Sequence, residues 1–131
     1  KSLAELDPNN TLQRDVPTVL GVSLWAETFA GTLAPGSYNY RISYANSVTG
    51  AVSPSSDPTI PRILSGIGQI RLTNLVPPPP GVFDQIRIYR SAADGSGPYT
   101  WVGEIAGTDT SFTDDGTNLD GTLAPETFGL P

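Results

Sequence analysis

Apolar and polar side chains alternate along several short stretches of this chain, with turn-forming residues between them. The clearest stretch is 38–44, where large side chains take one parity and polar ones the other. The large ones are Tyr38, Tyr40, Ile42 and Tyr44. Alternation with a period of two is typical of a strand with one buried face. Similar alternation, or a run of strand-forming residues, predicts six further strands, at 19–25, 51–53, 69–73, 85–90, 99–105 and 110–113.

The residues between these stretches favour turns over helices. The 14 glycines and 13 prolines are spread through the chain, and no segment has a helical period. The run 77–80 consists of four prolines, which cannot pair in a sheet, so it is predicted to be a stiff connector. Seven short strands without helices between them predict an all-β fold, an antiparallel two-sheet sandwich.

The length of 131 residues is that of one domain. The patterning divides it into an N-terminal arm or linker at 1–16, the sandwich at 17–115 and an extended C-terminal tail at 116–131. Arms outside a core often become ordered only against neighbouring subunits. The two arms therefore favour a protein that contacts other proteins.

One group of residues resembles the signature of fibronectin type III-like domains, which combines a leucine, a proline–glycine pair and a tyrosine. Here Leu33 is followed by Pro35-Gly36. The tyrosines stand five and seven positions after Leu33, where the signature has one at six, and this strand comes early in the chain. The likeness implies a fibronectin type III-like, that is immunoglobulin-like, sandwich.

A second group resembles the immunoglobulin-like modules of bacteriophage virion proteins and bacterial surface proteins. In those modules the tyrosine-rich strand is second and an Arg-Ile-Tyr-Arg strand lies in the middle. The residues that carry this likeness lie within 70–75, 87–91 and 99–114. The resemblance implies a place in a virion, as a tail, fibre or decoration protein, or an extracellular place at a cell surface.

Composition narrows the classes of function. With 13 acidic and 7 basic residues the net charge is −6, which opposes binding to nucleic acid or to an anionic membrane. No apolar run approaches the ~20 residues that span a bilayer, so we expect no membrane insertion. Cysteine and histidine are both absent, which removes thiolate sites, the commonest general base and the commonest zinc ligand. We therefore expect no enzyme activity and no cofactor.

Acidic residues are the only candidates for chemistry. A paired-carboxylate glycosidase would draw on Asp109, Asp114, Asp115 and Asp120, but each stands in a turn-like context, where Asp caps its own backbone. Asp114, Asp115, Asn118 and Asp120 also supply oxygen ligands of the kind that calcium prefers. They lack the EF-hand spacing and its distal Glu. A solvated acidic turn is the favoured interpretation.

Aromatic residues are candidates for partner or sugar contacts. By parity, Tyr38, Tyr40 and Tyr44 are predicted to be core, and Trp101 to be a buried residue between the sheets. Two contact candidates then remain: Tyr89, which is predicted to be exposed because Ile86 and Ile88 have the opposite parity, and Trp25.

A pentapeptide, Gly-Thr-Leu-Ala-Pro, occurs at 31–35 and again at 121–125. The spacing is close to the length of one immunoglobulin-like domain. Either a second module or a matching subunit contact begins near the second copy, or the repeat is a coincidence among turn residues; coincidence is favoured.

The sequence thus predicts a non-catalytic structural or assembly module of a phage virion or bacterial surface structure. Its partners would be neighbouring structural proteins or copies of itself, bound through sheet edges and terminal arms. Two alternatives remain: a carbohydrate-binding or host-recognition adhesion module that contacts a surface glycan, and an accessory domain of an extracellular enzyme.

Overall fold

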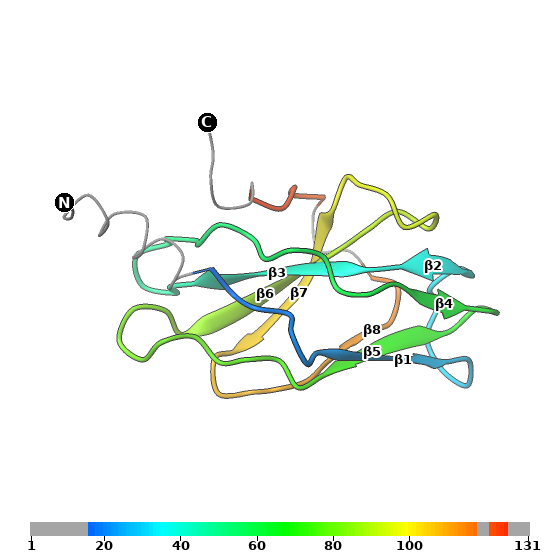
Figure 1. Ribbon diagram of the computed structural model, residues 1–131, viewed down its shortest axis with the longest axis horizontal. Coiled ribbons are helices and arrows are strands. Elements are labelled where there is room, and N and C mark those ends of the chain that lie inside the picture. The colour runs from blue at the N-terminus through cyan, green and yellow to red at the C-terminus, as the bar shows by residue number, and fades with distance from the viewer. Residues whose placement is uncertain (1–15, 118–120, 126–131) are drawn as a thin grey trace.

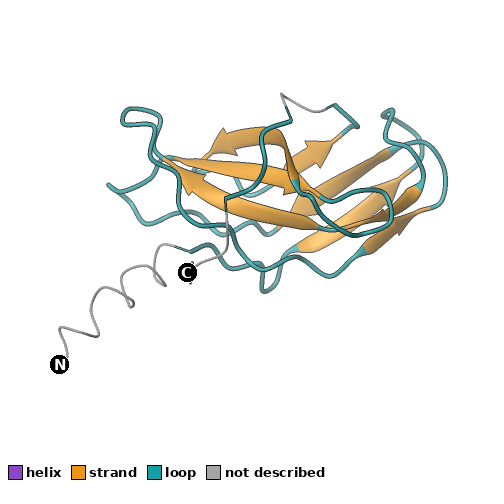
Figure 2. Ribbon diagram, turned by 90° about the horizontal axis from the view of Figure 1, so that it is seen from above, coloured by secondary structure: helices purple, strands orange, loops and turns teal. Residues whose placement is uncertain are grey.

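The computed structural model describes residues 16–117 and 121–125, and this part of the chain forms eight strands in three small antiparallel sheets (Figure 1). The first sheet has the order β1-β5-β8: Ser23–Glu27, Gln69–Thr73 and Phe112–Asp114. The second has the order β3-β6-β7: Tyr40–Ala45, Gln85–Arg90 and Thr100–Ala106. The third pairs β2 with β4: Gly36–Tyr38 and Arg62–Leu64. The described part contains no helix, so none that could cross a membrane; Figure 2 draws this part as strands and loops.

The two three-stranded sheets bury their inward side chains in one common core. β3, β5 and β6 contribute alternate residues, and the shared members are Tyr40, Ile42, Tyr44, Ile70, Leu72, Ile86 and Ile88. Full burial of such an aliphatic side chain contributes roughly 2 kcal/mol. The predicted all-β fold and the predicted core tyrosines are therefore confirmed.

The predicted strands at 69–73 and 85–90 are confirmed as β5 and β6. The tyrosine-rich stretch forms two strands, β2 and β3, because the chain changes sheets at Asn39. The Asn39 N–H donates to Ser91 Oγ over 3.1 Å, and its Nδ2 donates to the Gly95 carbonyl over 2.8 Å. These bonds tie Asn39 to the turn after β6 and interrupt the ladder.

Other boundaries differ from the predictions. The first strand begins at Ser23, later than expected, since the Val22 N–H closes a turn on the Val19 carbonyl and Gly21 has a φ of 85°. The predicted strand 51–53 is reduced to a single bridge between Ala45 and Val52. β4 was not predicted, because Arg62 and Ile63 are both exposed and so lack alternation.

The segment 53–59 runs along the edge of β3 without being a strand. Three of its hydroxyl residues each donate a backbone N–H to a β3 carbonyl and accept a β3 N–H at the side-chain oxygen. The pairs are Ser53 with Tyr44, Ser56 with Ile42, and Thr59 with Tyr40. Hydroxyl oxygens thus take the place of backbone carbonyls along this edge.

The described part of the C-terminal tail lies along β7. The Trp101 N–H donates to the Thr122 carbonyl, and the Ala124 N–H donates to the Tyr99 carbonyl, each over 2.9 Å. The two pentapeptide copies take different places: Leu33 is buried and bridges Gly68, whereas Leu123 is 60% exposed and bridges Thr100. The predicted N-terminal arm, apart from Val16, lies outside the described residues.

Candidate functional site

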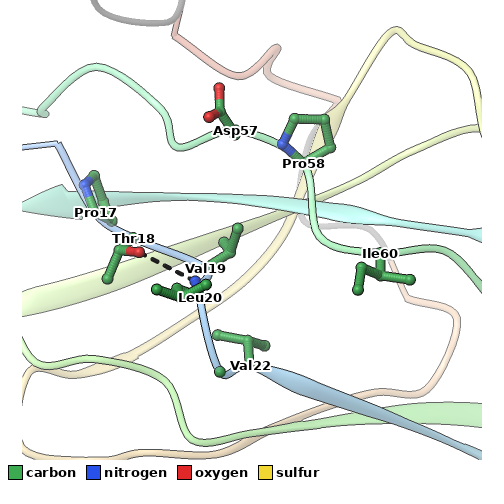
Figure 3. A pocket seen from close by; sticks show the side chains of 9 residues that line it. Pro17, Thr18, Val19, Leu20, Val22, Asp57, Pro58 and Ile60 are labelled. Atoms are coloured by element: carbon green, nitrogen blue, oxygen red, sulfur yellow. Dashed lines mark hydrogen bonds between the residues drawn. The ribbon is translucent and has the colours of Figure 1, made fainter.

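An open groove separates the segment 17–22 from the segment 57–60 (Figure 3). It encloses about 520 Å³. Pro17 and Pro58 line it and cannot donate to a ladder, and Gly21 adopts a left-handed φ. Both segments are therefore held as irregular backbone, and the space between them stays open.

A second hollow, of about 290 Å³, continues the groove along β1. The two hollows share Val22 and Ile60 as lining residues. The second reaches Trp25 on one side and Arg62 on the other. Together they form what we call the β1 groove, which runs from Pro17 along the N-terminal half of β1.

The rim of the β1 groove carries large apolar side chains in solvent. Leu20 and Ile60 are each 85% exposed, and Figure 3 shows them on opposite sides of the hollow. Of the described lining residues only Asp57 and Arg62 carry charge, one in each hollow. An acid–base pair that could perform catalysis is therefore not assembled among them, whereas exposed apolar surface around a groove is typical of a contact site.

Trp25 stands at the end of the groove with its ring fixed in place. Its Nε1 donates to Thr73 Oγ1 over 3.0 Å, and the Arg71 guanidinium lies 5.6 Å from the ring centroid. Glu27 accepts from Gln69 over 2.8 Å and from Arg71 over 3.1 Å. The hydrogen bond from Gln69 lowers the pKa of Glu27, and Arg71 acts in the same direction, so this face of the sheet carries a stable carboxylate.

Comparison with known proteins leaves this groove unassigned. Neither a protein-family model nor a curated protein matches this sequence significantly. What is established is an all-β protein of antiparallel sheets with an open groove beside β1.

Of the two aromatic contact candidates, Trp25 is 47% exposed, as the prediction requires, and lines the groove. The predicted exposure of Tyr89 is wrong, because the side chain is only 1% exposed. Tyr89 is not a member of the core cluster that the two sheets share, as its parity implied. However, β6 is the central strand of its sheet, and Tyr89 stands in register between Arg41 and Trp101. Parity gives the face of a sheet, not how closely neighbours cover a residue there.

Trp101 is not buried between the sheets. The β7 strand has one extra residue, Val102, between the partners of Ile88 and Tyr89. This bulge reverses the parity, so Val102 joins the core and Trp101 pairs with Tyr89 on the outer face. There the Arg87 guanidinium lies 4.4 Å from the Trp101 ring centroid.

Of the four calcium candidates, Asn118 and Asp120 lie outside the described residues. Asp114 is buried and points into the protein, where Arg90 Nη1 and the Tyr40 hydroxyl donate to it over 2.8 and 2.6 Å. Burial raises the pKa of Asp114. Asp115 accepts from the Thr117 N–H in its own turn. The described pair therefore serves the fold: Asp114 anchors the core and Asp115 caps a turn.

Leu20 and Ile60 were not among the predicted contact residues. Leu20 was assigned to the first predicted strand, and Ile60 lies outside all the predicted strands. A usable signal existed for Ile60, which is a large apolar residue between Pro58 and Pro61 in a segment without alternation. Such a residue has no strand face through which to reach the core.

Proposed function

We propose that this protein is a non-catalytic contact module that binds another protein chain through the β1 groove. Within the all-β class, its fold is an immunoglobulin-like, fibronectin type III-like sandwich. The protein is part of an assembled structure such as a phage virion or a bacterial surface. The resemblance of the tyrosine-rich and Arg-Ile-Tyr-Arg strands supports that place.

Two features support the immunoglobulin-like assignment. The two three-stranded sheets share one core, as the layers of a sandwich do. The Tyr38 hydroxyl donates to the Ala34 carbonyl, four residues upstream, over 2.7 Å. This bond is similar to the tyrosine corner of such folds, although the corner there stands near the start of a late strand and Tyr38 belongs to β2.

The observation that carries the contact function is the exposure of Leu20 and Ile60 beside a strand edge. Each is 85% exposed, and they lie on opposite sides of an open groove. Covering two such side chains stabilises a complex by roughly 1.5–3 kcal/mol each before binding costs. A partner chain that lies in the groove would cover both.

Photocross-linking of the full chain in its natural source tests this function. A benzophenone side chain in place of Ile60 is expected to form protein adducts when illuminated. The control places the same group at Val48, which is 88% exposed but lies in the turn after β3 and lines no part of the groove. Adducts at position 60 that are no more abundant than at position 48 would contradict the proposal.

A second function, glycan binding, is favoured by the surroundings of Trp25. Its exposed ring lies on the same sheet face as the hydrogen-bonded side chains of Glu27, Gln69 and Arg71. A flat ring beside fixed polar groups suits the apolar face and the hydroxyls of a sugar. On a glycan array the unmodified chain is expected to give a binding signal. Trp25→Ala is expected to lose this signal, and Phe29→Ala is expected to keep it. A blank array at millimolar affinity would remove this second candidate.

A further inference from the structure

Two strand edges of the larger sheets are already occupied, and β1 has an open edge. Segment 53–59 bonds along β3, and Thr122 and Ala124 bond along β7. Within the described residues β1 pairs only with β5. The hollow between Val22–Trp25 and Ile60–Arg62 lies beside this edge. Another chain can therefore approach the edge of β1 from solvent. An open edge presents N–H and C=O groups that can pair with another strand.

The sequence of β1 does not protect the edge. Natural edge strands are commonly protected by Lys, Pro or a bulge. β1 reads Ser-Leu-Trp-Ala-Glu, with an unbroken register to β5 and only one charge, that of Glu27. This pattern favours pairing with a further strand.

The β1 strand is complementary to itself about Trp25. If two copies of β1 pair antiparallel with their Trp25 residues opposite each other, Ser23 stands opposite Glu27 of the second copy, and Leu24 opposite its Ala26. The two Glu27 carboxylates are then at opposite ends of the pairing. Like charges directly opposite would destabilise a sheet, and this register avoids them although the chain carries a net charge of −6.

The same register brings exposed apolar groups together beyond the strand ends. Beyond the paired residues, the turn that carries Leu20 and Gly21 lies next to the turn that carries Phe29 of the second copy. Phe29 is 80% exposed, and a Cβ added at Gly21 would meet no atom within 4 Å, so there is open space beside Leu20. A twofold axis makes this contact twice, once at each end, as an isologous interface requires.

We propose that two copies of this chain associate through antiparallel pairing of their β1 strands about a twofold axis at Trp25. Phe29 of each copy lies in the β1 groove of the other, against Leu20. The inference rests on the proposed contact function and names its partner as a second copy. The two β1-β5-β8 sheets become one continuous six-stranded sheet.

Single cysteines test the register, since the chain has none of its own. Opposed residues in antiparallel strands have Cα atoms about 4.5–5.5 Å apart, which suits a disulfide. Trp25→Cys is therefore expected to cross-link to itself under mild oxidation, and a mixture of Ser23→Cys and Glu27→Cys to cross-link to each other. Ser23→Cys alone is the matched control, because its two copies stand four positions apart, roughly 13 Å along the strands.

The unmodified chain is expected to sediment as a dimer at millimolar concentration. Leu20→Asp and Phe29→Asp are expected to sediment as monomers with unchanged circular dichroism and thermal unfolding, while Val48→Asp stays dimeric. A monomeric unmodified chain, or Ser23→Cys that cross-links alone as readily as the mixture, would overturn the pairing. If photocross-linking at position 60 captures a different protein, the second copy is the wrong partner and the contact function stands. If it captures nothing, both fail.

Discussion

The Tyr40 hydroxyl donates to Oδ2 of Asp114 over 2.6 Å and so joins the two three-stranded sheets inside the core. Tyr40 belongs to β3 and Asp114 to β8, and neither side chain is more than 1% exposed. Arg90 of β6 donates to the other carboxylate oxygen over 2.8 Å. Three strands from both sheets therefore meet at one buried polar cluster.

Removal of the Asp114 carboxylate is expected to be severe. Asp114→Ala takes the carboxylate from a largely buried Arg90, and loss of one partner of a buried ion pair costs about 3–5 kcal/mol. Tyr40→Phe removes one donor and costs about 1–3 kcal/mol. Urea unfolding measures both. Asp115→Asn is the control, because Asp115 is exposed and Asn keeps the oxygen that accepts the Thr117 N–H. Equal stability of Asp114→Ala and the control would contradict this role.

The hydroxyl ladder along β3 makes a second prediction. Ser56→Ala leaves the buried Ile42 N–H without its acceptor, so the free energy of unfolding is expected to fall by about 1–3 kcal/mol. The Ile42 amide is also expected to exchange faster with deuterium. Ser65→Ala, at an exposed position, should change neither quantity measurably. A Ser56→Ala variant with unchanged amide exchange at Ile42 would show that the ladder does not hold this edge.

Strands with one buried face were predictable from the sequence. β5 and β6 match their predicted ranges because Ile70, Leu72, Ile86 and Ile88 face the core while polar residues face outward. The core tyrosines followed from the same alternation. The local alternation of apolar and polar residues is enough to predict which face of a sheet a side chain lies on.

Features that depend on distant segments could not be predicted. The Val102 bulge is a relation between β6 and β7, and it moved Trp101 to the outer face. The β1 groove forms between Leu20 and Ile60, which are forty positions apart in the chain. The sequence around one of them therefore does not indicate that the other lies nearby. The candidate site was therefore found only in part, through Trp25.

Close packing across the sheets predicts a third effect. A Cβ added at Gly103 would stand 2.3 Å from two ring atoms of Phe112. Gly103→Ala is thus expected to destabilise the protein by about 1–3 kcal/mol through overpacking. Gly66→Ala is the matched control, since its Cβ would meet only ordinary contact with Thr28, at 3.8 Å.

A double variant distinguishes steric overlap from a loss of strand pairing. Replacing Phe112 by Leu shortens the side chain, so Gly103→Ala is expected to cost less in the Phe112→Leu background than alone. Chemical denaturation of the four proteins gives the coupling energy. Costs that simply add would contradict direct overlap between the two residues.

Alkaline pH is expected to unfold the protein through its buried tyrosines. Burial raises the pKa of Tyr44 from 10 to about 12, and burial with the nearby Asp114 carboxylate raises the pKa of Tyr40 well above its usual value. When the pKa of a phenol is higher in the folded state than in the unfolded state, the fold favours the protonated phenol. The contribution of such a phenol to the free energy of unfolding is therefore complete below pH 10 and is lost as the pH rises through about 12.

For Tyr44 that contribution is roughly 2–3 kcal/mol. Absorbance at the tyrosinate band and circular dichroism, followed together through this pH range, should show buried tyrosines ionising only as the β signal disappears. Tyr44→Phe removes the bond to the Val76 carbonyl but cannot ionise, so its stability should depend less steeply on pH between 10 and 12. If Tyr40 and Tyr44 ionise near pH 10 while the sheets stay intact, burial does not raise their pKa and this prediction fails.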